Sequence, residues 1–175
     1  MADSLVTYRQ LVELYPQGVS IGAYQRRYIW GREREPHGDS VTNLTDCLLR
    51  AYADGEDYFL QGLTFNGAAL IDGQQRLTYM TLLLRWIGYD STLPIVYEGR
   101  PAATAYMAGD MAADSNDPDV YFMRLTISLV ARQIEESGAD QAGFRDYLLT
   151  RVTMRYLQLP DGSDPVTVYL SLIHI

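Results

Sequence analysis

The chain has 175 residues, of which 47% are hydrophobic and 21% charged, so it is long enough to bury a core and too apolar for a disordered chain. Its net charge of −8 argues against a general nucleic-acid coat, which is normally basic. All 14 Lys and Arg positions are Arg, and a chain without Lys has no P-loop lysine and no Schiff-base chemistry.

The first third of the chain predicts helix, strand and helix. Asp3 or Ser4 caps a helix that Pro16 ends, with apolar residues at helical spacing: Leu5, Tyr8, Val12 and Tyr15. Residues 19–30 favour a strand and lack a helical period, and a polar loop follows. Asp39 or Ser40 caps the second helix, which Asp54-Gly55 ends. Its predicted buried face is Leu44, Cys47, Leu48 and Ala51.

A hairpin and a buried helix come next. Residues 58–65 and 68–71 read as strands joined by Asn66-Gly67, a strong hairpin signal. After Asp72-Gly73, residues 74–88 form a helix that is apolar on nearly all sides, which is typical of a buried helix.

The remaining chain is more helical. Asp117-Pro118 begins a long helix that ends at Ser137-Gly138, a shorter helix covers 140–149, and a strand covers 151–159. We therefore predict an α+β fold with three parts: a core over residues 1–90, a helical extension ending in a strand over 91–159, and an atypical tail over 160–175.

The segment from Ile71 to Thr78 (IDGQQRLT) carries the clearest chemical signal. It places Asp72 at a helix N-cap and leaves the backbone amides from Gly73 onward free to bind an anion. Arg76 could hold a phosphate, Gln74 or Gln75 could orient an attacking water, and Asp72 could hold Mg²⁺ or accept a proton. Local physics alone also allows a purely structural role, in which Asp72 only caps the helix and Arg76 is solvated.

The segment from Tyr24 to Trp30 (YQRRYIW) is the second candidate. In a strand, one face would carry Tyr24, Arg26, Tyr28 and Trp30, and the other face would carry Gln25, Arg27 and Ile29. Aromatic rings beside an Arg make a platform for a base, although an aromatic strand packed on the core is the alternative.

Together the two segments resemble the DUF262 proteins, the GmrSD-type N-terminal domain related to the ParB/sulfiredoxin fold. The motif I-P-x-Y-Q-R-x-Y-x-W is matched by Ile21, Tyr24, Gln25, Arg26, Tyr28 and Trp30. The motif D-G-Q-Q-R-x-T is matched by Asp72, Gly73, Gln74, Gln75, Arg76 and Thr78. The resemblance covers roughly residues 1–90 and weakens beyond them.

The resemblance implies a ParB-like core and a domain of a bacterial anti-phage restriction system. It implies that Asp72, Gln74, Gln75 and Arg76 hydrolyse an NTP with Mg²⁺. It also implies that Tyr24, Gln25, Arg26, Tyr28, Trp30 and Gly73 bind nucleotide or sense foreign or modified DNA. The nuclease that such a domain regulates would lie in another domain or on another chain.

The sequence departs from the family pattern in three places. Gly22 replaces a Pro, residues 169–175 do not continue as the family's F-E-x-L-N-x-R-G segment, and neither His37 nor His174 lies in a nuclease pattern. Three hypotheses therefore stay open: an NTP-hydrolysing sensor, a non-catalytic DNA- or nucleotide-binding module, and a truncated fragment of such a protein.

Location and DNA affinity are the last expectations. A single cysteine, Cys47, fits a reducing compartment, and the N-terminus lacks the basic and apolar regions of a secretory signal. We expect a cytoplasmic protein with no membrane partner. Arginines cluster at Arg26, Arg27, Arg32 and Arg34, but interleaved Glu residues weaken the patch, so DNA binding should be weak and salt-sensitive.

Overall fold

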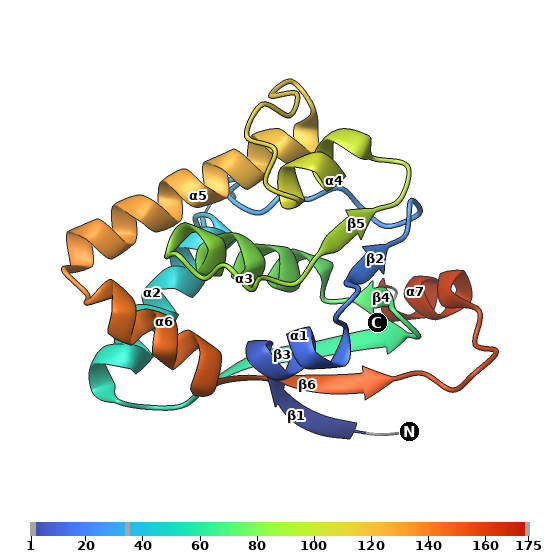
Figure 1. The fold of residues 1–175 in the computed structure, drawn as a ribbon, viewed down its shortest axis with the longest axis horizontal. Helices are drawn as coiled ribbons and strands as arrows, with labels where there is room; N and C mark the ends of the chain where they lie inside the picture. The colour runs from blue at the N-terminus through green and yellow to red at the C-terminus, as the bar shows by residue number, and fades with distance from the viewer. Residues whose placement is uncertain (1–2, 34–35, 174–175) are drawn as a thin grey trace.

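The computed structural model describes residues 3–33 and 36–173 (Figure 1), so the predictions for Arg34 and for His174 lie outside the described residues. A mixed six-stranded sheet has the strand order β1-β6-β3-β4-β2-β5. The strands are β1 (Asp3–Thr7), β2 (Val19–Ile21), β3 (Tyr58–Asn66), β4 (Ala69–Asp72), β5 (Ile95–Tyr97) and β6 (Val152–Gln158). The pairs β1–β6 and β3–β4 are antiparallel, and the other neighbours are parallel.

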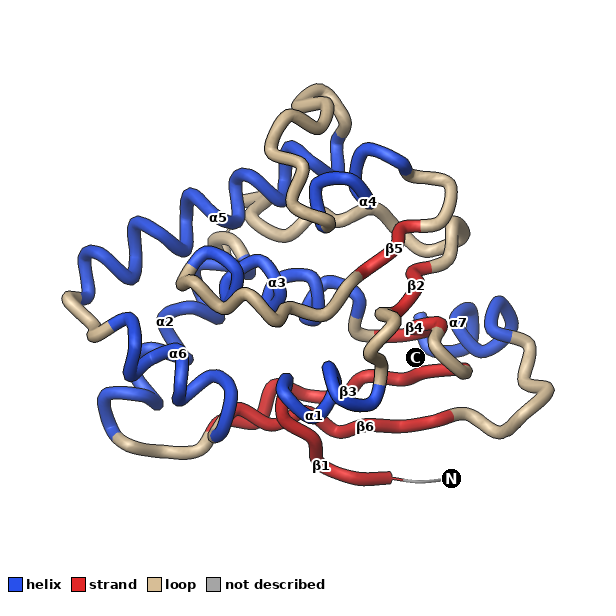
Figure 2. Tube along the Cα trace, viewed as in Figure 1, coloured by secondary structure: helices blue, strands red, loops and turns tan. Residues whose placement is uncertain are grey.

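The helices pack around the sheet and around each other (Figure 2). They are α1 (Tyr8–Leu14), α2 (Ser40–Asp54), α3 (Gln74–Trp86), α4 (Pro101–Met107), α5 (Pro118–Ser137), α6 (Gln141–Thr150) and α7 (Pro165–Ile173). The central helix is α3, which runs between the sheet and α5. Strands from both sides of residue 90 share the one sheet, because β6 lies between β1 and β3 and β5 pairs with β2. Among the described residues, no helix combines the length and the apolar character needed to cross a membrane.

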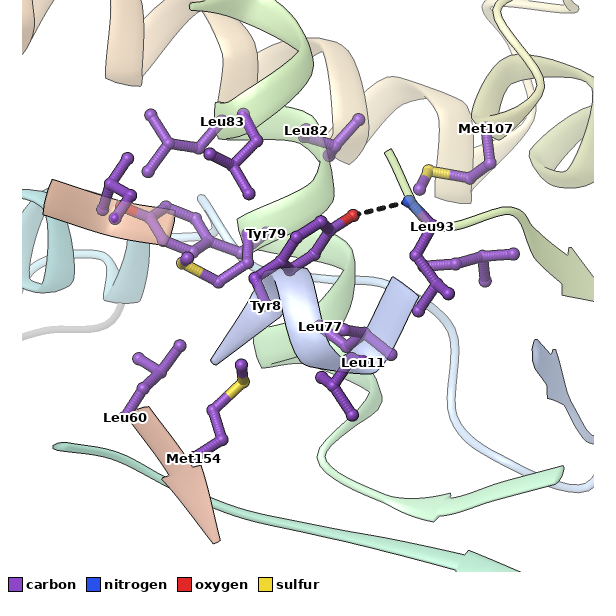
Figure 3. Packing of buried hydrophobic residues seen from close by; sticks show 14 of the residues in the cluster. Tyr8, Leu11, Leu60, Leu77, Tyr79, Leu82, Leu83, Leu93, Met107 and Met154 are labelled. Atoms are coloured by element: carbon purple, nitrogen blue, oxygen red, sulfur yellow. Dashed lines mark hydrogen bonds between the residues drawn. The ribbon is translucent and has the colours of Figure 1, made fainter. Parts of the chain in front are cut away.

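The core explains the many tyrosines of the sequence. Figure 3 shows Tyr8 among buried aliphatic side chains, with its hydroxyl accepting a hydrogen bond from the Leu93 amide at 2.9 Å. Tyrosine hydroxyls that lie inside the molecule also pair with threonine hydroxyls: Tyr8 with Thr81, Tyr28 with Thr126, Tyr79 with Thr45 and Tyr97 with Thr78. Each pair satisfies two polar groups without water, so large rings can fill the core without an unpaired hydroxyl.

The helix boundaries predicted by capping residues are mostly confirmed. Asp39, Asp117 and Asp140 each accept backbone hydrogen bonds at the start of a helix, and Gly55 and Gly138 end helices with a left-handed backbone. The first predicted helix is wrong in its first turn. Residues 3–7 instead pair with β6, and Thr7 begins α1 through a reciprocal capping box with Gln10.

The strand predicted over residues 19–30 is wrong beyond Ile21. Pairing with β4 and β5 ends there, and residues 22–30 form an irregular loop, here named the 22–30 loop. The predicted division of its side chains between two faces fails as well, because Tyr28 is buried whereas Tyr24 is 39% exposed. A second correction concerns Cys47, which is exposed. The buried residues of α2 are Val41, Thr45, Leu48 and Ala51.

Candidate functional site

The two sequence motifs meet in one cleft of about 500 Å³, here named the motif cleft. Its lining residues come from the 22–30 loop, from the β4–α3 turn and from α7: Gln25, Arg26, Trp30, Ile71, Asp72, Gly73, Gln74, Gln75, Arg76 and Tyr169. The volume lies within the range of small-molecule sites. Eight of the ten residues predicted to act at a site line it, and the two that do not are Tyr24 and Tyr28.

The N-terminus of α3 opens into the motif cleft. The N-cap is Gly73, and no side chain accepts a hydrogen bond there. The predicted N-cap, Asp72, is therefore wrong: it ends β4, its side chain is half exposed, and a carboxylate oxygen lies 3.4 Å from the Arg76 guanidinium. The first-turn amides of α3 and the positive end of its helix dipole are features that favour a negatively charged group at this end of the helix.

Gly73 is required by the backbone and by its neighbours. Its φ of +94° is a left-handed conformation that glycine adopts without strain. A Cβ at this position would lie 2.4 Å from Leu63 Cδ2 and 3.0 Å from the Gly62 carbonyl oxygen. The glycine thus lets the β4–α3 turn pack against β3.

Gln75 holds the 22–30 loop in place. Its amide nitrogen donates to the Arg27 carbonyl oxygen and its oxygen accepts from the Ile29 amide, both at 3.0 Å. Both ends of the side chain are therefore used by the fold. This explains why the predicted strand is absent: a side chain supplies the backbone partners that a neighbouring strand would provide.

Gln74 and Gln25 each keep one buried atom without a partner. The Gln74 nitrogen donates to the Arg26 carbonyl oxygen at 2.9 Å, and the Gln25 nitrogen donates to the Leu70 carbonyl oxygen. Their Oε1 atoms have no partner among the described residues, although the two residues are only 5% and 4% exposed. Buried polar atoms normally find partners, so two unpaired acceptors on one cleft indicate a place for a ligand's donor groups or for water.

Arg76 lies at the edge of the motif cleft. Its guanidinium donates to the Gln61 side chain at 2.9 Å and to the Gly62 carbonyl oxygen at 2.7 Å. Burial lowers the pKa of Arg76, whereas the nearby Asp72 acts in the opposite direction. Gln61 has a left-handed backbone (φ 63°) at the irregularity of β3, and sequence reasoning missed it because no motif marks a bulge.

An ion-pair network centred on the buried Asp119 holds the rest of the 22–30 loop in place. Sequence reasoning also missed this network. Asp119 is fully buried and accepts from the Tyr28 amide at 2.6 Å, from Arg27 at 2.9 Å and from Arg100 at 3.3 Å. Arg100 also donates to the carbonyl oxygens of Gly22 and Gln25. The only available signal was an acidic residue in the first turn of α5, which is ordinary at a helix start.

Tyr169 of α7 covers one side of the motif cleft. Its hydroxyl accepts from the Arg26 amide at 3.4 Å, and its ring packs edge-on against Tyr24 at 5.5 Å between centroids. Tyr24, which does not line the cleft, thus supports the Tyr169 wall from behind. The predicted atypical tail thus supplies a wall of the site.

The side chains of the motif cleft favour an anion. Arg26 and Arg76 outnumber the single carboxylate, Asp72, and the α3 N-terminus adds to the positive potential. No cluster of three His, Cys, Asp or Glu that could hold a metal occurs in the described part of the chain. The donor set nevertheless fits Mg²⁺ in its usual nucleotide form, which needs only one or two protein carboxylates together with phosphate oxygens.

Comparison of the chain with protein-family models, with curated proteins and with solved structures gives no match. Function is therefore inferred from the residues of the motif cleft and from the two motifs themselves.

Proposed function

We propose that the motif cleft binds the phosphates of a nucleoside triphosphate, in a domain that hydrolyses nucleotide and senses DNA for a bacterial anti-phage restriction system. The observation that carries the proposal is the uncapped N-terminus of α3, which opens into the same cleft as Arg26 and Arg76. The resemblance to DUF262 proteins supplies the biological setting. The β3–β4 hairpin that leads into the buried α3 supports the proposed ParB-like core.

Hydrolysis would draw on the acceptors of the motif cleft. Mg²⁺, held by Asp72 and by phosphate oxygens, would neutralise phosphate charge. Alternatively, the half-exposed Asp72 carboxylate, which pairs with Arg76 through one oxygen, would accept a proton from water in place of holding the metal. Gln74 Oε1 is the better candidate for orienting that water, because Gln75 is already bonded at both ends.

The binding step is tested by thermal unfolding with increasing NTP or inorganic triphosphate, each with Mg²⁺. A ligand that binds only the folded chain stabilises it by about 2.7 kcal/mol at one hundred times its Kd. Arg26→Gln removes an exposed positive charge and should weaken both ligands. It should keep the fold, because the hydrogen bonds given for Arg26 are made by its backbone amide and carbonyl. Arg9→Gln, an equal charge change at an exposed position of α1, should weaken neither. The same unfolding temperature at every ligand concentration would reject the proposal.

A non-catalytic binding module is the second candidate, favoured by the structural use of both ends of Gln75. Phosphate release by the wild type and by Asp72→Asn separates the two candidates. Release that is lost in the variant, with ligand-induced stabilisation kept, supports hydrolysis. Stabilisation without any release, with or without DNA or a separately expressed nuclease partner, supports the binding module.

A further inference from the structure

A second cleft adjoins the motif cleft. It has a volume of about 320 Å³ and lies between α2, β3 and Trp30, and it is here named the α2–β3 cleft. Its lining residues are Trp30, Ser40, Asn43, Leu44, Cys47, Tyr58, Phe59, Leu60, Gln61 and Arg76. Trp30 and Arg76 line both clefts, so the two clefts adjoin at these side chains.

The walls of the α2–β3 cleft are aromatic and apolar. Phe59 is 54% exposed, which is unusual for a large ring on a β-strand of a packed sheet. Trp30 is half-buried, and its ring packs against the buried Tyr79 with 5.8 Å between centroids, so the core supports the ring. Rings of this kind bind nucleobases by stacking, which every base can do with its flat face.

Apart from Arg76, the polar side chains that line the same cleft are neutral. Ser40 and Asn43 begin α2, and the Asn43 nitrogen donates to the His37 carbonyl oxygen at 2.8 Å, which holds the amide in place. A hydroxyl and an amide can both donate and accept, as the edge of a heterocyclic base requires. An apolar site with a few fixed polar groups is the usual composition of a small-molecule pocket.

The boundary between the two clefts is strained and fixed. Gln61 has a left-handed φ of 63°, which costs energy for a residue with a side chain, and its side chain accepts from Arg76 at 2.9 Å. The Arg76 guanidinium is thereby held where phosphate and base would join. Strain of this kind persists where surrounding structure enforces it and is concentrated at ligand-binding segments.

We infer that the α2–β3 cleft receives the base of the nucleotide, between Trp30 and Phe59, with Arg76 at the junction to the phosphates. This inference rests on the proposed function, because it places one part of the ligand whose phosphates bind at α3. It assigns nucleobase recognition to α2 and β3, which lie outside both sequence motifs; only Trp30 and Arg76 of this cleft belong to them.

Cys47 gives a direct test, because it is the only cysteine of the chain, is exposed, and lines the α2–β3 cleft. The rate of thiol alkylation is measured on the full chain with Mg²⁺ and with ATP, GTP, CTP or UTP in turn, and then with inorganic triphosphate. At ten times its Kd, an NTP leaves about one molecule in eleven free, so alkylation should slow about tenfold. Inorganic triphosphate, which has no base, should leave the rate unchanged.

The outcomes separate this inference from the proposed function. Thermal stabilisation by NTP without slower alkylation would overturn the base site and leave the phosphate site standing. Equal protection by NTP and inorganic triphosphate would also overturn it, because the base would then contribute nothing. No stabilisation and no protection by any NTP would overturn both.

A variant gives an independent measurement. Phe59→Ala should weaken NTP about tenfold, in line with the loss of one stacked ring, and should leave inorganic triphosphate affinity unchanged. Leu5→Ala is the matched control, since Leu5 is 62% exposed on the edge strand β1 and lines neither cleft. Equal NTP affinity in the wild type and Phe59→Ala would contradict the inference.

Discussion

Gly73 shows how one residue positions the whole site. An alanine there would meet Leu63 at 2.4 Å and would also have to adopt a φ of +94°. We expect Gly73→Ala to lower the free energy of unfolding by about 2–4 kcal/mol, combining left-handed strain with an overpacked contact. Urea unfolding measures the loss, and weaker nucleotide binding should accompany it because the α3 N-terminus shifts.

Gly109 provides the control for Gly73. Its φ of +99° is nearly the same, but nothing lies within 4 Å of an added Cβ. Gly109→Ala should therefore cost only the backbone strain, about 1–2 kcal/mol. Equal losses in the two variants would mean that the contact with Leu63 contributes nothing.

Gln75 is the residue whose predicted role the structure most changes. Because its side chain bonds Arg27 and Ile29, Gln75→Ala should leave a part-buried backbone donor and acceptor without these partners and lower stability by about 1–3 kcal/mol. Gln17→Ala, at an exposed position, should change stability by less than about 0.5 kcal/mol. A Gln75→Ala variant of wild-type stability that no longer releases phosphate would restore a catalytic role for this residue.

At the scale of elements, the 22–30 loop depends on α5 through Asp119. Asp119→Asn removes a buried charge that two arginines and a backbone amide share, and we expect a loss of about 3–5 kcal/mol. The control is Asp57→Asn, which breaks the exposed Arg151–Asp57 pair and should cost less than about 1 kcal/mol. Urea unfolding measures the free energy of unfolding of both variants. Similar losses would show that the Asp119 network is no stronger than a surface pair.

The sequence predicts those elements whose hydrogen-bond partners lie close by in the chain. The caps at Asp39, Asp117 and Asp140 and the Asn66-Gly67 turn are local, so short motifs predict them. The 22–30 loop is different, because its backbone partners belong to side chains more than 40 residues away, such as Gln75 and Asp119. Its β-favouring composition therefore predicts a strand, whereas the folded chain forms a loop there.

The candidate site, too, is predicted by the sequence only in part. The meeting of Gln25, Arg26 and Trp30 with the segment Asp72–Arg76 is what the paired motifs indicate, and one cleft contains them. The roles within that cleft depend on tertiary packing, which sequence spacing does not contain. The contribution of Tyr169 and the left-handed Gln61 become visible only when β3 and α7 are placed beside the turn.

At the scale of the whole molecule, the buried tyrosines limit how far the pH can rise before the folded state loses stability. Burial raises the pKa values of Tyr8, Tyr28, Tyr79 and Tyr97 above the ordinary 10. The folded state then keeps protons that the unfolded state loses above pH 10, so their contribution to stability is complete below pH 10 and falls as pH rises. Each tyrosine should lower stability by about 1.4 kcal/mol per pH unit above that point.

The alkaline transition can be followed in two signals. Phenolate absorbance from the buried tyrosines and loss of helical circular dichroism should change together, because these rings ionise only on unfolding. Tyr97→Phe should make the decline of stability shallower by about 1.4 kcal/mol per pH unit. Full phenolate absorbance in a chain that retains native circular dichroism would contradict this expectation.

Charge distribution over the whole molecule determines what DNA binding the chain can achieve by itself. The net charge is −8, and Arg27 is already paired with Asp119 and Asp117, so the described arginines left on the predicted patch are Arg26 and Arg32. Two phosphate contacts predict a slope of about −2 for the logarithm of the binding constant against the logarithm of salt concentration. Fluorescence anisotropy with duplex DNA at several salt concentrations measures this slope.

Arg32→Gln should bring the slope closer to zero by about one, whereas Arg9→Gln, distant from the patch, should leave it unchanged. A slope near −6 or steeper, or tight binding at high salt, would show a larger basic surface than these residues form. A shallow slope has a consequence for function. A patch with only these two arginines cannot hold DNA tightly by phosphate contacts alone, so the proposed DNA sensing through this patch would require a second chain or domain to supply more positive charge.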